Sequence, residues 1–190
     1  MKIQTYVLIG LILVVILIGG CIQQTKPTYK TDINNTNEVV LDSKKAIIET
    51  GISEEELDKQ KVAQLSLEWA IMGKNIPDYD LIKDKNNIIV STRNINKNYN
   101  FSLKNIKFSI LTQEEIQQKS NTEGDFLYFE FQTLDISDNN ATVKLNNIWA
   151  ESEENKKKGL AYLSGGGATI PFKKERGRWL SENVTEMWIS

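Results

Sequence analysis

The sequence predicts an α+β domain behind an N-terminal signal or anchor segment, and three observations lead to this prediction. The first is an uncharged stretch over residues 3–25 whose centre is aliphatic. The second is one long helical pattern over residues 53–73, and the third is a series of strand-like segments after it. A helix followed by consecutive strands is typical of α+β proteins. We therefore expect a long helix packed on one face of a curved antiparallel sheet of about five to six strands.

The N-terminal segment has the pattern of a secretory signal peptide. Lys2 supplies a positive start, and residues 7–18 are aliphatic apart from Gly10. These 12 residues are fewer than the roughly 20 that a membrane-spanning helix needs. We predict a cleaved signal peptide over residues 1–20, and a retained transmembrane anchor is the alternative.

The single cysteine of the chain, Cys21, directly follows this segment in the stretch "IGGC". The stretch resembles the lipobox of prokaryotic lipoproteins, in which a branched apolar residue and two small residues precede a cysteine. The resemblance implies cleavage before Cys21 and attachment of lipid to its thiol through a thioether. It also implies an archaeal or bacterial lipoprotein on the cell membrane, with its domain facing outside the cytoplasm.

The residues after Cys21 predict a tether and then one domain. Residues 22–37 are rich in Gln, Thr, Lys and Asn, a composition that does not pack into a core. We assign residues 21–38 to the lipidated cysteine and a flexible tether, whose r.m.s. reach is roughly 20 to 25 Å. Residues 39–190 are then expected to form a single α+β domain that folds cooperatively.

The helical pattern begins at a capping signal. Ser53 precedes three glutamates, and a serine with Glu56 three residues later predicts a capping box. The acidic first turn also suits the positive end of the helix dipole. An apolar stripe at helical spacing continues up to Gly73, and it contains Leu57, Val62, Leu65, Trp69 and Met72.

Six later segments are rich in β-branched and aromatic residues and predict strands. In the third of them, Leu127 and Phe129 are expected on one face, and Tyr128 and Glu130 on the other. Residues 113–120 predict one or two helical turns, while residues 151–159 predict an exposed loop. The predicted strands cover residues 86–95, 106–112, 126–136, 141–150, 159–172 and 178–190.

The C-terminal stretch "IPFKKERGRWLSENVTEMWIS" combines a basic strand, a glycine-containing turn and a tryptophan that leads into a last strand. It resembles the closing hairpin of cone-shaped α+β domains in the nuclear transport factor 2-like and cystatin-like families. Uncharacterised prokaryotic lipoproteins carry domains of this kind. The resemblance implies a cone-shaped fold and an extracytoplasmic location, and it transfers no catalytic residue to this chain.

The composition excludes several kinds of chemistry. The chain has no histidine, which removes Ser-His-Asp and Cys-His catalysis and the common zinc sites. With one cysteine it has no intrachain disulfide, and its net charge of −2 gives no electrostatic reason to expect a nucleic-acid partner. We expect no catalytic residue, no metal and no cofactor.

Carboxylates remain as candidates for a hydrolase that uses a pair of acids. Charges in turns and loops are usually solvated, so a hydrolase is the less favoured interpretation. It would require two of the acidic side chains to meet in a pocket. The candidates are Glu114, Glu115, Asp135, Asp138, Glu151, Glu153 and Glu154.

Three consecutive glycines, Gly165, Gly166 and Gly167, lie within strand-like sequence. A phosphate-binding loop would need a helix directly after the glycines, and strand-like sequence follows here instead. A strong bend of the sheet is therefore the favoured interpretation, and a ligand contact is the alternative.

Three tryptophans, Trp149, Trp179 and Trp188, fall on predicted strands. At least one of them is expected to face the concave side of the sheet, where cone-shaped domains hold a cavity. Core packing is the favoured role, and an aromatic wall for an apolar or sugar-like ligand is the alternative.

Four Asn-x-Ser/Thr sequons offer sites for N-linked glycans in an exported protein. Their asparagines are Asn34, Asn100, Asn140 and Asn183. The last of these is expected inside a strand, which is an unfavourable place for modification.

Together these features predict a lipid-anchored, extracytoplasmic protein without catalytic activity that binds a ligand or another protein. Its partners would be membrane lipid, through Cys21, and a small molecule or protein that the sequence does not identify. Two alternatives remain open. An accessory subunit of a membrane complex would show an exposed apolar patch of several hundred Å². A hydrolase would show converging carboxylates.

Overall fold

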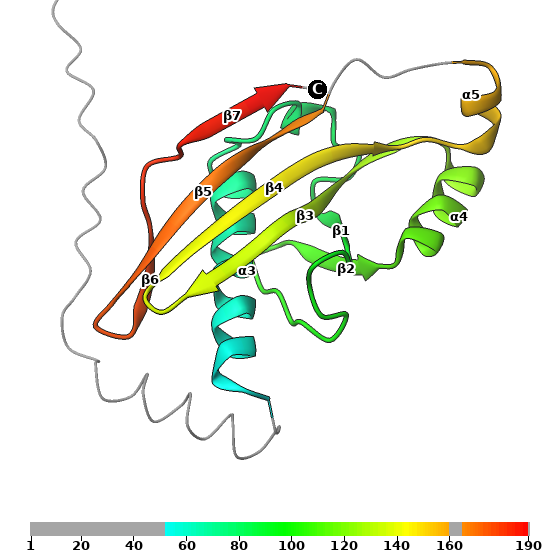
Figure 1. Ribbon diagram of the computed structural model, residues 1–190. Helices are drawn as coiled ribbons and strands as arrows, with labels where there is room; N and C mark the ends of the chain where they lie inside the picture. The colour runs from blue at the N-terminus through cyan, green and yellow to red at the C-terminus, as the bar shows by residue number, and fades with distance from the viewer. Residues whose placement is uncertain (1–51, 160–164, 190) are drawn as a thin grey trace, which may run out of the picture. The chain divides into compact units, whose positions relative to one another are not determined.

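The computed structural model describes residues 52–159 and 165–189 (Figure 1). The predicted signal peptide, Cys21, the tether and the sequon at Asn34 lie outside the described residues, as do the boundaries predicted at residues 20 and 38. The described residues form helices and one strongly curled sheet, which confirms the α+β class. None of the described helices is long and apolar enough to cross a membrane.

The long helix α3 (Glu54–Met72) packs against β3, β4 and β6 of the sheet. Its start is as predicted, because the Oγ of Ser53 accepts a hydrogen bond from the N–H of Glu56 at 3.2 Å. The other half of the predicted capping box is replaced by a longer-range contact. The carboxylate of Glu56 instead interacts with the hydroxyl of Tyr99, far along the chain, and raises the pKa of that phenol.

The buried face of α3 differs from the predicted stripe. Val62 is buried as expected, but Met72 is 62 % exposed, and Leu65 and Trp69 are only partly buried. Small side chains on the buried face let the helix approach the aromatic residues of the sheet closely. The buried hydroxyl of Ser66 donates a hydrogen bond to the carbonyl oxygen of Val62, one turn earlier in the helix, at 2.9 Å. The buried residues of α3 are Val62, Ala63, Ser66, Leu67, Ala70 and Ile71.

Within the described residues, seven strands form one sheet in the order β2-β1-β3-β4-β5-β6, and β7 also pairs with β5 (Figure 1). The predicted last strand is split, since β6 pairs with the C-terminal half of β5 and β7 pairs with its N-terminal half. This split raises the number of strands above the expected five to six. The strands are β1 (Asn87–Ser91), β2 (Lys107–Leu111), β3 (Phe126–Ser137), β4 (Asn140–Ala150), β5 (Gly166–Glu175), β6 (Arg178–Ser181) and β7 (Glu186–Ile189).

The sheet is mixed, and the prediction of an antiparallel sheet was wrong at one side. β1 runs parallel to both β2 and β3, for example through the pair Val90 and Phe129. Parallel neighbours need a crossover. The chain supplies residues 92–106 between β1 and β2, and the helix α4 (Gln113–Glu123) between β2 and β3. Strand composition alone does not reveal pairing direction, because the direction depends on where these crossovers return.

Apolar residues are buried on both faces of the sheet. The face toward α3 carries the main core, with Phe129, Phe131 and Phe172 among the largest fully buried side chains. On the opposite face, α4 covers a smaller cluster that includes Ile116 and Tyr128. The predicted alternation along β3 is therefore confirmed. Its second face is buried as well because α4 lies on it.

The shorter helices complete the fold. α4 confirms the helical turns predicted for residues 113–120, and it begins with a capping box between Thr112 and Glu115. The residues 151–159, predicted as an exposed loop, instead contain the short helix α5 (Glu153–Lys157). A 3₁₀ turn, η2 (Tyr79–Leu81), follows α3.

Candidate functional site

A polar hollow with a volume of about 470 Å³ lies between the first turns of α3, the loop after β1 and the middle of β3. Buried Ile95, Tyr99 and Leu134 also line it and form its floor. The hollow brings together three segments that are far apart in the sequence, as binding sites on a rigid scaffold commonly do. Its polar lining consists of Glu56, Lys59, Asn94, Asn96, Gln132 and Asp135.

A β-bulge in β3 shapes one wall of the hollow. The register with β4 shifts between Phe131 and Thr133, so Gln132 is the extra residue. Asn94, at the start of the loop after β1, holds this bulge. Its Nδ2 donates to the carbonyl oxygens of Phe131 at 2.9 Å and of Gln132 at 2.7 Å. The bulge therefore exposes Gln132 at the hollow instead of pairing it within the sheet.

The loop after β1 is held on two sides. Gln64 of α3 forms a reciprocal pair of hydrogen bonds with Ser102, with its Nε2 donating to the carbonyl at 3.0 Å and its Oε1 accepting from the N–H at 2.9 Å. On the other side, Lys97 forms an ion pair with Glu115 of α4 at 2.9 Å. Tyr99 packs edge to face with Phe101, with ring centroids 6.0 Å apart. The wall that this loop supplies is thus fixed before any ligand arrives.

The charges of the hollow are arranged around Lys59. The ion pair with Glu55, at 2.7 Å, raises the pKa of Lys59, and Glu56 and Asp135 raise it further. Burial raises the pKa of Tyr99 most, and the hydrogen bond to Glu56 adds to that effect. The hollow therefore presents an ammonium group beside two carboxylates, with a phenol that stays protonated.

This arrangement is suited to binding a polar ligand. Carboxylates accept hydrogen bonds, an ammonium group donates them, and side-chain amides do both. Such a mixture matches ligand groups that also donate and accept, above all hydroxyls. The part of the chain that the structure describes contains no group of three or more His, Cys, Asp or Glu side chains that could hold a metal ion.

The three predicted glycines lie at the start of β5, away from the residues that line the hollow. Gly165 and Gly166 have φ values of 127° and 156°, which other residues rarely adopt, in agreement with the predicted bend. The N–H of Gly165 donates to the Oδ2 of Asp78 at 2.6 Å. A Cβ on Gly166 would lie 2.1 Å from the carbonyl oxygen of Trp188. The glycines thus let the chain turn into the sheet and let β7 approach β5 closely.

The three predicted tryptophans do not converge on one site. Trp149 and Trp179 pack against the main core on the face toward α3, and neither lines the hollow. The Nε1 of Trp179 donates to the Oδ1 of Asp58 in α3 at 2.8 Å. Trp188 is paired with Gly167 of β5. The next residue, Ala168, is buried on the face toward α3, and successive residues of a strand point to opposite faces, so Trp188 lies on the face away from α3.

Of the seven predicted carboxylates, only Asp135 lines the hollow. Glu115 caps the N-terminus of α4. Its hydrogen bond from the N–H of Thr112 and, next, its contact with Lys97 lower its pKa. Glu153 and Glu154 form ion pairs with lysines of the same short segment at 3.0 and 2.5 Å. The acid that shares the hollow with Asp135 is Glu56, which the sequence patterns had assigned to a helix cap.

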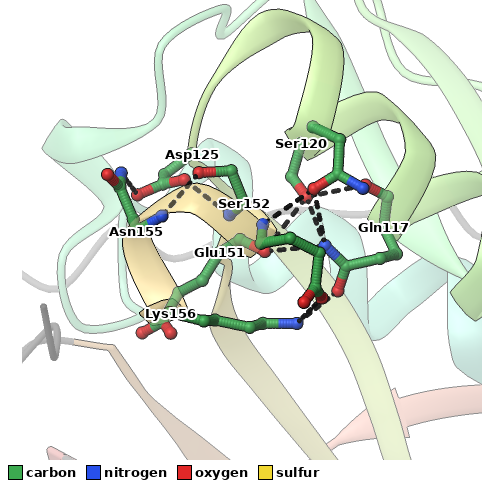
Figure 2. A network of polar contacts seen from close by, with 9 residues as sticks. Gln117, Ser120, Asp125, Glu151, Ser152, Asn155 and Lys156 are labelled. Atoms are coloured by element: carbon green, nitrogen blue, oxygen red, sulfur yellow. Dashed lines mark hydrogen bonds and ion pairs between the residues drawn. The ribbon is translucent and has the colours of Figure 1, made fainter. Parts of the chain in front are cut away.

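Glu151 belongs to a structural junction between α4 and α5 (Figure 2). Its carbonyl oxygen accepts hydrogen bonds from the Nε2 of Gln117 at 2.9 Å and from the Oγ of Ser120 at 3.2 Å. Asp125 accepts from the N–H of Ser152 at 2.7 Å and from the Nδ2 of Asn155 at 2.5 Å. This network explains why a short helix forms where an exposed loop was expected.

Three of the predicted sequons lie within the described residues. Asn100, Asn140 and Asn183 are all exposed, as glycan acceptors must be. Asn183 lies in the segment that joins β6 to β7 and not inside a strand, which corrects the expectation for this residue.

The sequence patterns did not point to Glu56, Asn94, Tyr99 or Gln132 as site residues. One signal was available in "NINKNYN" at residues 94–100, because a run so rich in asparagine disfavours a strand and favours turns with positive φ. The bulge at Gln132 gave no comparable signal, since the strand pattern continues through it.

Comparison with protein-family models, with curated proteins and with solved structures finds no match to this chain. Its function must therefore be argued from its own geometry.

Proposed function

We propose that this chain is a lipid-anchored, extracytoplasmic protein whose domain binds a small, hydroxyl-rich ligand such as a sugar. The ligand would occupy the hollow at the β3 bulge. The observation that carries this proposal is that two carboxylates, Glu56 and Asp135, and several amides line one hollow whose walls are already held in place.

The anchoring part of the proposal rests on the sequence. The lipobox-like "IGGC" places Cys21 directly behind a short apolar segment. A curled sheet with one long helix packed against it is compatible with the resemblance to cone-shaped lipoprotein domains. In this proposal, lipid on Cys21 holds the domain at the outer face of the cell membrane.

The ligand class follows from the balance of charge and hydrogen-bonding groups. Planar carboxylates and amides can each contact two neighbouring hydroxyls of one ring. Glu56 and Asp135 oppose the binding of phosphate or carboxylate groups, because like charges brought together cost several kcal/mol. Lys59 is already paired with Glu55, so it offsets this repulsion only in part. A neutral or amino-substituted sugar fits these groups better than an acidic one.

Hydrolysis is a second candidate function, and one observation favours it. Glu56 and Asp135 line the same hollow, so they are candidates for the acid and base of a glycoside hydrolase. Binding is preferred because Glu56 interacts with the hydroxyl of Tyr99, whose raised pKa keeps the proton on the phenol. A hydrolase would need Glu56 free to exchange a proton with substrate or water.

The proposal can be tested with the full chain, purified from membranes in detergent. Saturation-transfer NMR would compare neutral, amino-substituted and acidic sugars of similar size. We expect binding of neutral or amino-substituted sugars that remain chemically unchanged after prolonged incubation. Binding of acidic sugars alone, or of none, would contradict the ligand class, and the appearance of cleavage products would establish the hydrolase instead.

A further inference from the structure

Glu130 of β3 carries a buried carboxylate, with a side chain that is 4 % exposed. Removing a charge from water is costly unless the charge is paired and hydrogen-bonded. Both oxygens of this carboxylate have such partners. Its Oε1 accepts a hydrogen bond from the Nη1 of Arg93 at 3.0 Å, and its Oε2 accepts one from the Nε2 of Gln113 at 2.7 Å. The two partners hold the carboxylate in one orientation.

Three segments of the chain meet at this carboxylate. Arg93 lies just after the end of β1, Gln113 is the first residue of α4, and Glu130 lies in β3. The fully buried Ser91, at the end of β1, links the two partners of Glu130. Its Oγ accepts hydrogen bonds from the N–H of Arg93 at 3.1 Å and from the Nε2 of Gln113 at 3.0 Å. The point where the loop leaves β1 is therefore fixed against both β3 and α4.

The wall of the hollow begins one residue further along the chain. Asn94 lines the hollow, and its amide donates to the carbonyl oxygens of Phe131 and Gln132 at the bulge. Glu130 directly precedes Phe131, as Arg93 directly precedes Asn94. The ion pair and the amide contacts therefore join the same two segments at successive positions. A displacement of Arg93 would displace Asn94 and with it the bulge.

We propose that Glu130 is a positioning residue of the hollow, which acts through Arg93 on Asn94 and on the bulge at Gln132. It determines how tightly the hollow binds by fixing this wall before a ligand arrives. The effect on binding rests on the proposed function. The effect on Asn94 does not, because it can be measured without a ligand.

The chemistry of the pair favours a positioning role over a purely stabilising one. An apolar pair of similar volume often stabilises a protein as well as a buried ion pair does, so such a pair is weak evidence for stability. Fixing one geometry is the other role that a buried ion pair can have. At Glu130 the geometry that is fixed lies directly beside the binding wall.

Asp125 provides a matched comparison in the same domain (Figure 2). It is 6 % exposed and, like Glu130, it accepts two hydrogen bonds, here from the N–H of Ser152 and the Nδ2 of Asn155. These partners lie at the start of α5 and within it, whereas the hollow is formed by α3, the loop after β1 and β3. Loss of either carboxylate should lower stability, but only the loss of Glu130 should change the hollow.

NMR of the full chain in detergent, with ¹⁵N-labelled asparagine, tests the structural step. Asn94→Ala identifies the side-chain amide signal of Asn94. In Glu130→Gln, which keeps the size and removes the charge, the amide hydrogens of Asn94 should exchange with solvent at least tenfold faster than in the parent chain. In Asp125→Asn their exchange should be unchanged.

Arg93 variants repeat the test should Glu130→Gln not fold, because the side chain of Arg93 is 58 % exposed and tolerates substitution better. Arg93→Ala should accelerate the exchange at Asn94 as Glu130→Gln does. Arg93→Lys keeps the positive charge and should stay within about threefold of the parent chain.

Titration calorimetry with glucose and glucosamine tests the step to binding. Glu130→Gln and Arg93→Ala should weaken the affinity of the parent chain at least tenfold, whereas Asp125→Asn should leave it unchanged. Folded variants of Glu130 and Arg93 with parental exchange at Asn94 and parental affinity would overturn the proposal, as would equal effects of Asp125→Asn. A parent chain that binds neither sugar, while Asn94 still responds to Glu130→Gln, would support the positioning role and contradict the proposed ligand.

Discussion

The side-chain amide of Asn94 donates a hydrogen bond of 2.7 Å to the carbonyl oxygen of Gln132, the extra residue of the β3 bulge. Asn94 itself has a φ of 60°, which asparagine tolerates better than most residues. One side chain thus fixes both the start of the loop after β1 and the wall of the hollow. The stability of the bulge and the shape of the site should therefore change together.

Replacing Asn94 by alanine should lower the free energy of unfolding by about 1–3 kcal/mol, because two carbonyl contacts are lost and φ stays positive. Urea unfolding measures this change. Asn105→Ala is the matched control, since Asn105 is exposed and has a φ of 64°. This variant should lose only about 1 kcal/mol of unfolding free energy, the cost of holding alanine at a positive φ. Equal losses in the two variants would mean that the amide of Asn94 does not hold the bulge.

Alkaline pH should destabilise the protein through Tyr99. Burial, followed by the interaction of the hydroxyl with the Glu56 carboxylate, raises the pKa of this phenol above its ordinary value of 10.0. Below pH 10 both the folded and the unfolded chain keep the proton, so the stabilisation is fully present. Above pH 10 the unfolded chain releases the proton first, and the free energy of unfolding falls by about 1.4 kcal/mol per pH unit for such a group.

The free energy of unfolding of the Tyr99→Phe variant should therefore fall less steeply above pH 10 than that of the parent chain. Urea unfolding at a series of alkaline pH values provides the comparison. Burial also raises the pKa of Tyr79 and of Tyr128, so some decline remains in the variant. Identical pH dependence in the parent and the variant would show that Tyr99 is not shielded from solvent in the way described.

Gly167 should not tolerate alanine, because a Cβ there would lie 2.4 Å from the ring of Trp188 and 2.6 Å from the Oδ1 of Asn146. We expect the free energy of unfolding to fall by about 1–3 kcal/mol and the tryptophan fluorescence to change. Gly177→Ala is the control, since its added Cβ meets nothing within 4 Å and only its φ of 76° is unfavourable.

Alanine at all three of Gly165, Gly166 and Gly167 should likewise lower the melting temperature. If the melting temperature stayed the same while sugar binding was lost, the glycines would be ligand contacts, and the structural role described for them would be wrong.

Cys21→Ser should abolish lipid attachment and release the protein from the membrane fraction. Intact-mass analysis of that fraction checks the parent chain, which should begin at a lipid-modified Cys21. Retention of residues 1–20 with an unmodified thiol would instead indicate a transmembrane anchor.

Local signals predicted much of the fold. The Ser53 cap, the alternation along β3 and the helical turns after β2 depend on neighbouring residues, and all three were predicted correctly. The parallel pairing of β1 was not, because it depends on two crossovers that return the chain to the same end of the sheet. The buried face of α3 was also misjudged, since close packing selected Ala63 and Ala70 over the larger Met72.

The candidate site was harder to predict than the fold. Asp135 had been named as a candidate acid, but its neighbours in the hollow come from residues up to 79 positions earlier, at Glu56. Glu56 also carries a strong local signal for a helix cap, which masked its contact with Tyr99. A bulge such as the one at Gln132 changes the direction of a side chain without changing the strand pattern around it.

The central claim, that the hollow binds a hydroxyl-rich ligand, is tested most directly by comparing Asp135→Asn with Asp138→Asn. Both changes remove one carboxylate, but Asp135 lines the hollow, whereas Asp138 lies in the turn between β3 and β4, where its φ of 53° suits asparagine equally well. Titration calorimetry with the sugar that the parent chain binds best gives the two affinities. Asp135→Asn should weaken binding at least tenfold while Asp138→Asn leaves it unchanged. Equal affinities for the two variants would contradict the assignment of the site.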